Sequence, residues 1–284
     1  MAKNIMKKTL CLALAVTATC ASLATMTACE TSHPKVEMVL EFNNETYTLE
    51  YNLNRKLTPA TAKHFLELVD AKFYDGLCVH DYEASNWYTG VYSYDKESSS
   101  LVYKSYLTAV KAMEEKGVFA STVWHDEQMA KSTYTLYGEF KSNNFEVENG
   151  SIENEFGALT MRYTSKGDLA DTRIWAKRSD GTGVDPKEYG YNSATSMFSI
   201  NVGTRSALKD YCTFAELDED SVEILRNLKN AIAEYVESHS DDEEFAVETE
   251  AIINEEDVYA DADVVSFKTP VEPIKINSMK VTKW

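Results

Sequence analysis

Basic residues are scarce in this chain of 284 residues. Lys and Arg number 28 against 46 Asp and Glu, which gives a formal net charge of −18. Phosphate binding needs a basic face, so this balance argues against a nucleic-acid partner. The acidic surplus is concentrated in residues 241–263, which hold eleven Asp or Glu and no Lys or Arg. That run lacks the glycine-punctuated spacing of an EF-hand loop, and we interpret it as a solvated excursion rather than a calcium site.

Cysteines and metal-ligand motifs are also sparse. Of five cysteines, three lie at or before residue 29, which leaves Cys78 and Cys212 for the folded part. Both lie in apolar runs, where a free cysteine usually packs as a small core residue. A disulfide between them stays an alternative in an exported protein. The sequence contains no zinc-ligand spacing and no HExxH motif, and we expect no metal or other cofactor.

A long membrane-spanning run is missing too. The apolar stretch Leu10–Ala24 is too short and too rich in Ala and Thr to span a bilayer, and three lysines precede it. We interpret residues 1–28 as a signal peptide. It ends in Met-Thr-Ala before Cys29, as bacterial lipoprotein signals do, although Met stands where Leu is usual. We predict that Cys29 carries lipid, that 29–35 form a short linker and that the protein is anchored on the extracytoplasmic face of the bacterial cell membrane. Cleavage without lipid is the alternative.

The remaining sequence alternates short strands with a few helices. A hairpin is predicted over 36–51, and helices are predicted over 59–71, 101–116 and 220–237 from their caps and apolar faces. Thr58 is the expected N-cap of the first of these helices. The chain ends in a short strand at 273–276. This mainly β pattern predicts a barrel closed at its ends by helices.

Six motifs in order along the chain resemble the cyclophilin-type peptidyl-prolyl cis-trans isomerase family. They are Pro59-x-Thr61 with Phe65-Leu66-x-Leu68, Phe73-Tyr74-Asp75-Gly76-Leu77 with His80, Gly138-Glu139-Phe140, Gly157-Ala158-Leu159-Thr160-Met161, Asn192–Ile200, and Pro273-Ile274-x-Ile276-x-Ser278. The resemblance implies a closed eight-stranded antiparallel barrel capped by two helices over residues 36–284. Two stretches are longer than in the family, and we expect insertions at about 91–135 and 240–265, the first carrying the helix near 101–116.

The resemblance also implies where the site lies and what it lacks. In cyclophilins an apolar pocket holds the proline ring while an arginine donates to the prolyl region; here Asp81 stands at the arginine position, and an ionised carboxylate cannot donate. The positions that match the family site are Asp81, Trp87, Thr89, Arg162, Ser199, Leu208 and Tyr211. We expect Arg162 to lie within ion-pair distance of Asp81. Trp87 with Tyr82 and Tyr88 forms either an exposed aromatic platform or part of the core, and His80 is expected to be structural.

Three functions follow as hypotheses. The first is a lipoprotein with weak or lost isomerase activity, whose groove still binds extended proline-containing peptides or exported proteins. The second is an active isomerase that helps exported proteins to fold and uses Arg162 as its donor. The third is a structural assembly subunit at the membrane surface.

Overall fold

The computed structural model describes residues 31–139, 152–163, 173–178, 180–188, 193–204, 212–239, 244–253 and 263–284. Within these ranges the chain is mainly β, as the sequence predicts, with three helices. The strands are β1 (Lys35–Phe42), β2 (Glu45–Leu53), β3 (Asp81–Tyr82), β4 (Asn86–Thr89), β5 (Tyr92–Asp95), β6 (Ser100–Tyr103), β7 (Val123–Trp124), β8 (Leu136–Tyr137), β9 (Leu159–Tyr163), β10 (Arg173–Lys177), β11 (Val184–Glu188), β12 (Ser193–Asn201), β13 (Cys212–Leu217), β14 (Ala246–Ile253), β15 (Asp263–Pro270) and β16 (Lys275–Lys283). The helices are α1 (Pro59–Asp70), α2 (Tyr106–Glu115) and α3 (Glu219–Ser238).

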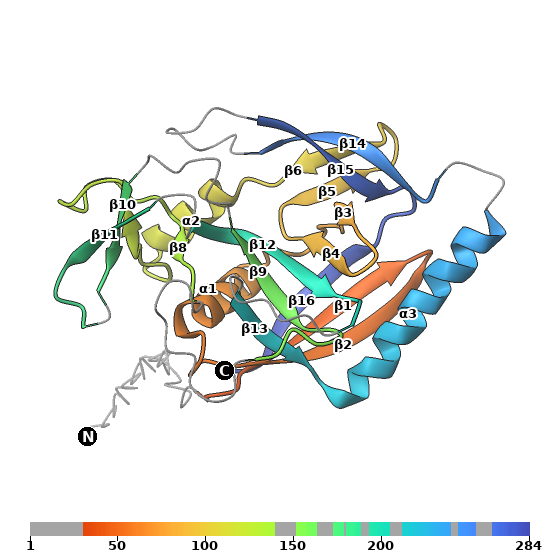
Figure 1. The fold of residues 1–284 in the computed structure, drawn as a ribbon, viewed down its shortest axis with the longest axis horizontal. Helices are drawn as coiled ribbons and strands as arrows, with labels where there is room; N and C mark the ends of the chain where they lie inside the picture. Colours follow the sequence, from red (N-terminus) through yellow and green to blue (C-terminus); the bar gives the residue numbers. More distant parts are fainter. Residues whose placement is uncertain are drawn as a thin grey trace, which may run out of the picture.

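One curled antiparallel sheet forms the body of the molecule. Its order is β16-β1-β2-β13-β9-β12-β4-β3, with β8 also paired to β12 (Figure 1). The predicted hairpin is confirmed, because β1 and β2 pair without a shift from Lys35↔Asn52 to Phe42↔Glu45. Every second side chain of β1 is buried, so the period-two pattern of its sequence forms one wall of the core.

The predicted closure of the barrel is wrong, and the sheet is an open half-barrel. β3 and β16 are its two edges, and no ladder joins them within the described ranges. One isolated bridge, Cys78↔Lys275, links the segment before β3 to the start of β16. Farther along, β15 lies against β3, where the Thr269 hydroxyl donates to the carbonyl oxygen of His80 (2.8 Å). A contact with the hairpin β14–β15 therefore replaces a continuous β3–β16 ladder.

Helix α1 packs against β13 and β16 and places its aromatic face in the core. The ring of Phe65 lies 5.4 Å from that of Phe198 and 4.8 Å from that of Phe214. The helix begins where predicted, but the Thr58 side chain does not cap it. The carboxylate of Glu139 instead accepts the N–H groups of the first turn, at residues 60 and 61 (2.9 and 2.8 Å). A buried carboxylate suits this position because the helix N-terminus carries a partial positive charge.

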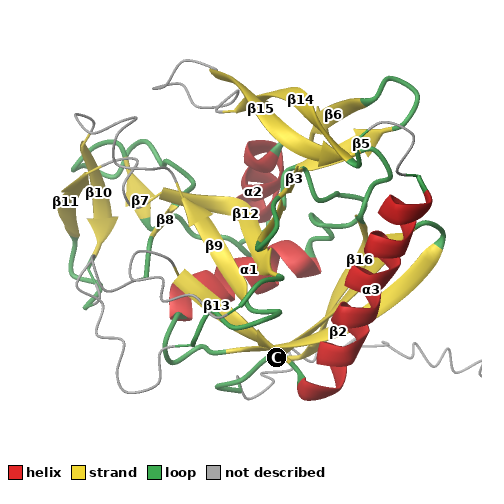
Figure 2. Ribbon diagram, turned by 45° about the vertical axis from the view of Figure 1, so that its right-hand side comes forward, coloured by secondary structure: helices red, strands yellow, loops and turns green. Residues whose placement is uncertain are grey.

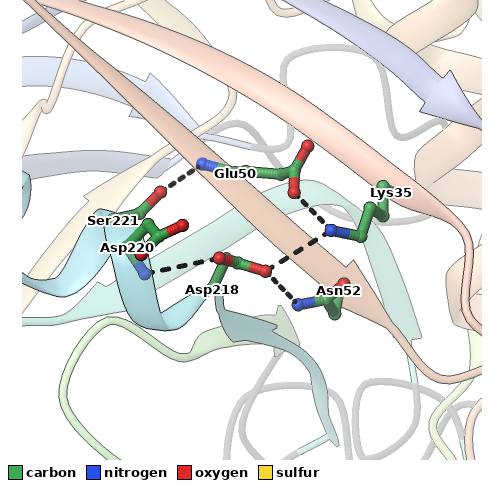
Figure 3. A network of polar contacts seen from close by, with 6 residues as sticks. All are labelled: Lys35, Glu50, Asn52, Asp218, Asp220 and Ser221. Carbon is green, nitrogen blue, oxygen red and sulfur yellow. Dashed lines mark hydrogen bonds and ion pairs between the residues drawn. The ribbon is translucent and has the colours of Figure 1, made fainter.

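Helix α3 lies across β2 and is fixed there by a polar network (Figure 3). Asp218 caps the helix, accepting the N–H of Asp220 (3.3 Å), and also accepts from the side chain of Asn52 (3.1 Å). Lys35 forms ion pairs with Asp218 (3.4 Å) and Glu50. Figure 2 shows α1 and α3 on different sides of the curled sheet.

The two stretches expected as insertions form hairpins that pack on each other. Strands β5 and β6 pair from Tyr92↔Tyr103 to Asp95↔Ser100, so the predicted helix at 101–116 is shorter and begins only at residue 106, after the Ser105 cap. Strands β14 and β15 pair along their whole length. Tyr92, Ala251 and Phe267 form a small apolar core between the two hairpins.

Cys78 and Cys212 are buried free thiols, as expected for core residues. The alternative of a disulfide between them is therefore not realised. Within the part of the chain that the structure describes, no helix has both the length and the apolar character needed to cross a bilayer.

Candidate functional site

The pairing register places Asp81 beside Tyr88 and Ser199 across three neighbouring strands. Asp81 on β3 pairs with Tyr88 on β4, Tyr88 pairs with Ser199 on β12, and Ser199 pairs with Thr160 on β9. Directly paired residues of a sheet point to the same face. We call Asp81, Tyr88, Ser199 and the nearby Arg162 the polar row.

The side chain of Arg162 extends from β9 to Tyr88 on β4, the strand that pairs with β3. Its guanidinium carbon lies 4.8 Å from the centroid of the Tyr88 ring. A guanidinium over an aromatic face is held by the negative charge of the π-system, a contact worth about 0.5–2 kcal/mol. Because Tyr88 pairs with Asp81, this contact brings the charge of Arg162 close to Asp81.

Asp81 and Arg162 nevertheless do not form the predicted ion pair. No salt bridge joins the two side chains, although both belong to the described residues. The carboxylate of Asp81 instead accepts the backbone N–H of Lys268 on β15 (3.2 Å). Burial raises the pKa of Asp81, while this hydrogen bond and the positive charge of Arg162 oppose the rise. Arg162 therefore contacts Tyr88, and Asp81 accepts a hydrogen bond from β15. These two contacts replace the expected ion pair between Arg162 and Asp81.

Trp87 and Thr89 lie on the opposite face of β4, outside the polar row. Trp87 is 1% exposed and stacks on Tyr82, with ring centroids 5.6 Å apart, so it belongs to the core rather than to an exposed platform. Thr89 is fully buried, and its hydroxyl donates to the carbonyl oxygen of Cys78 (2.7 Å). The residue of β4 that faces Asp81 is Tyr88, which motif matching missed by one position.

His80 is buried between the two accessory hairpins. Its ring lies 5.1 Å from that of Tyr92 and 4.9 Å from that of Phe267. Burial lowers the pKa of His80 to about 3, and the nearby positive charge of Arg162 adds to the effect. Its carbonyl oxygen accepts a hydrogen bond from the hydroxyl of Thr269, and its N–H donates to the carbonyl oxygen of Tyr88 (3.0 Å). These contacts support the expected structural role.

Two predicted site positions, Leu208 and Tyr211, lie outside the described residues. Among the described side chains, no group of His, Cys, Asp and Glu is arranged to hold a metal ion. The polar row offers one guanidinium, one carboxylate, one phenol and one hydroxyl, which are groups that form hydrogen bonds and charge interactions.

A hollow in the surface lies apart from the polar row, between the C-terminal half of α3 and the start of β14. Ile232, Val236 and Phe245 contribute to its lining, together with Tyr82. The ring of Phe245 lies 5.2 Å from that of Tyr82, so the aromatic core around Trp87 extends to this hollow.

Comparison with known proteins finds that the chain is similar to one family. The family model described as cyclophilin type peptidyl-prolyl cis-trans isomerase/CLD matches residues 38–253. A solved cyclophilin type peptidyl-prolyl cis-trans isomerase of Cryptosporidium parvum is similar with a TM-score of 0.44 and 13% identity, over 89% of this chain and 99% of that one. The same protein in the presence of the dipeptide Ala-Pro gives a TM-score of 0.43 and 14% identity, over 88% and 99%. No curated protein sequence matches the chain.

Proposed function

Because the chain belongs to the cyclophilin-type peptidyl-prolyl cis-trans isomerase family, we propose that it binds extended proline-containing segments of exported proteins along the polar row and isomerises them slowly or not at all. The proposal rests on the sequence resemblance, which matches Asp81 to the family arginine, and is supported by one observation: the carboxylate of Asp81 is held by the N–H of Lys268. The site keeps polar groups for binding but not the family's donor.

The weak catalysis follows from the chemistry of the prolyl bond. Its rotation faces a barrier of about 20 kcal/mol, and a catalyst must weaken the double-bond character of the amide. An arginine achieves this by donating hydrogen bonds, whereas ionised Asp81 only accepts them. Loss of one preorganised electrostatic donor typically costs about 10²–10³ in rate. We therefore expect turnover on Ala-Pro peptides at least about two orders of magnitude below that of an ordinary cyclophilin.

A second candidate function uses Arg162 as a relocated donor. Within the described residues its guanidinium has no hydrogen-bond or ion-pair partner and rests on the ring of Tyr88. Its N–H groups are thus available to a peptide carbonyl that lies beside Asp81. In this alternative the protein is an active isomerase for exported proteins, and Arg162 is its essential residue.

A protease-coupled isomerisation assay on Ala-Pro peptides separates the two candidates. Under the first, wild type and Arg162→Ala are equally slow; under the second, wild type is fast and Arg162→Ala loses about 10²–10³ in rate. Arg226→Ala is the matched control, because Arg226 on α3 also lies over an aromatic ring, that of Phe156 (5.7 Å). Cyclophilin-like rates in wild type would contradict the first candidate.

The binding part of the proposal is tested by titrating the same peptides while recording NMR spectra of the protein. Saturable shifts at residues of the polar row are expected, and they should weaken in Tyr88→Ala, which removes the support of Arg162. Absence of any binding by prolyl peptides would overturn the proposal and leave a structural assembly role as the alternative. We also propose the extracytoplasmic, lipid-anchored location, which rests on the sequence around Cys29.

A further inference from the structure

The hairpin β14–β15 is an amphipathic ribbon with one face on the protein and one in solvent. Thr249, Ala251, Phe267 and Thr269 are buried on its inner face. The outer face alternates with them and is exposed at Glu248, Glu250, Ile252, Val264, Ser266 and Lys268. One edge of the ribbon, along β14, lies against β6 (Figure 1).

The other edge, along β15, meets the rest of the protein at β3, near Lys268 and Thr269. The N–H of Lys268 points away from β14 and donates to Asp81. In an antiparallel pair, the backbone groups of alternate residues point to the same edge. The register Glu248↔Lys268 to Ile252↔Val264 has no shift, so the N–H and C=O groups of Ser266 and Val264 point to this edge too.

These outward groups have no strand partner within the described residues. Beyond the β14 ladder, no backbone hydrogen bond joins Val264 or Ser266 to another element. An unpaired strand edge is a template on which another extended chain can add. Asp81 marks one end of this template, because its carboxylate already occupies the N–H of Lys268.

The charge of this region decides which chain would add. Residues 241–263 contain eleven Asp or Glu and no Lys or Arg. Glu248 and Glu250 are exposed on the outer face of the ribbon. The outer face of β15 itself carries Val264, Ser266 and Lys268, so Glu248 and Glu250 lie one strand away from an added chain. A second copy of this chain would bring the same net negative charge to the region, and this repulsion opposes association. A basic chain would be attracted instead.

We propose that the β15 edge at Val264–Ser266 binds an extended peptide rich in Lys or Arg, which adds to the hairpin as a further strand. The backbone pairs with the outward N–H and C=O groups, and alternate side chains reach the carboxylates of the outer face. This site differs from the polar row in its groups and needs no proline, so it is independent of the function proposed above.

The test uses a synthetic peptide of alternating lysine and valine with blocked ends, titrated against the mature domain. Ser266→Pro removes one outward N–H, and proline is tolerated at such positions of edge strands. We expect this variant to bind on the order of tenfold more weakly than wild type. Ile252→Pro is the matched control, because Ile252 is uncharged, pairs with Val264, and has its N–H pointing to the opposite edge; it should bind within about twofold of wild type if strand addition uses β15. Thermal unfolding of each variant checks that the domain is folded.

Two altered peptides separate strand pairing from simple charge attraction. A peptide with N-methyl groups on alternate residues keeps its charge but loses strand donors, and we expect no saturable binding. A peptide with glutamate in place of lysine should also fail to bind. Equal binding by Ser266→Pro and wild type, or by the methylated and unmethylated peptides, would overturn the proposal. Concentration-dependent dimerisation that Ser266→Pro abolishes would also overturn it, since the occupant would then be a second copy.

Discussion

At the scale of single residues, the least usual feature is a buried histidine that has aromatic neighbours on two sides. Neither ring nitrogen of His80 has a hydrogen-bond partner within the described structure. Burial holds the pKa of His80 at about 3, and that of His64 on α1 at about 4, below the ordinary value of 6.5. Both side chains are therefore neutral in the folded protein at mildly acidic pH, where an unfolded chain would be protonated.

We predict that acidification destabilises the fold through these histidines. Below pH 6.5 His80 is protonated in the unfolded state, whereas in the folded state it stays neutral down to about pH 3. The free energy of unfolding therefore falls as the pH falls through this window. At pH 5 the loss attributable to His80 should be about 2 kcal/mol. Urea unfolding of wild type and His80→Leu at pH 7 and pH 5 measures it, because the variant lacks this contribution. His239→Gln, which alters an exposed histidine, should keep the wild-type dependence. An equal loss in wild type and His80→Leu would contradict the prediction.

The family motifs predicted some features of the site and missed others. The pairing register puts Asp81 and Ser199, two of the positions that the motifs matched, on one face of the sheet, with Arg162 near them. The motifs also placed Trp87 and Thr89 in the site, although both point into the core, since a strand turns each successive side chain to the opposite face. Only the pairing of β3 with β4 identifies Tyr88 as the neighbour of Asp81. The absence of the expected Asp81–Arg162 ion pair was not predictable, because the contacts that replace it come from Tyr88 and from the distant strand β15.

At the scale of elements, the contact between β15 and β3 rests on few hydrogen bonds. The hydroxyl of Thr269 is the donor to the His80 carbonyl oxygen, and both residues are buried. We predict that Thr269→Val, which keeps the shape and removes the donor, lowers the free energy of unfolding by about 1–3 kcal/mol, because the carbonyl loses its partner. Chemical denaturation measures this loss. Hydrogen exchange should also accelerate at the N–H of His80.

The control for this prediction lies on the same hairpin. Thr249 is buried on β14, and its hydroxyl makes only a long contact, 3.5 Å, to the carbonyl oxygen of Val247 in its own strand. Thr249→Val should therefore leave the exchange at His80 unchanged. If both variants accelerated it equally, the hairpin as a whole would stabilise β3, and the Thr269 hydroxyl would have no special part.

Elements with strong local signals were predictable, and those fixed by distant contacts were not. The helices near 59–71 and 220–237 were found within one residue of α1 and α3 at each end, because apolar periodicity and capping residues mark them. Thr58 was a reasonable cap by sequence, yet Glu139 reaches that helix end from far along the chain. The acidic stretch gave no strand signal, although part of it forms β14. The prediction of a closed barrel was wrong for the same reason, since neither the sequence of β3 nor that of β15 indicates that the two strands are in contact.

At the scale of the whole molecule, the two ends of the described chain lie together. The N–H of Thr31 donates to the carbonyl oxygen of Trp284 (3.0 Å), and β1 begins four residues later, beside β16. An anchor at Cys29 would therefore hold the domain close to the bilayer, with little linker between them.

The final prediction concerns that anchor. Removal of residues 1–28 takes away three lysines and no acidic residue, which leaves a mature chain of formal net charge −21. Such a chain gains no attraction from anionic lipid headgroups, so the two acyl chains of a diacylglycerol at Cys29 would have to carry the association alone. We predict that Cys29→Ala releases the protein from the membrane fraction or leaves it uncleaved, and that high salt does not mimic this effect in wild type. Fractionation and the mass of the mature N-terminus measure the outcome.

Cys20→Ala, within the leader, is the matched control and should be processed and retained as wild type. Retention of Cys29→Ala with wild-type processing would show that another part of the chain holds the membrane.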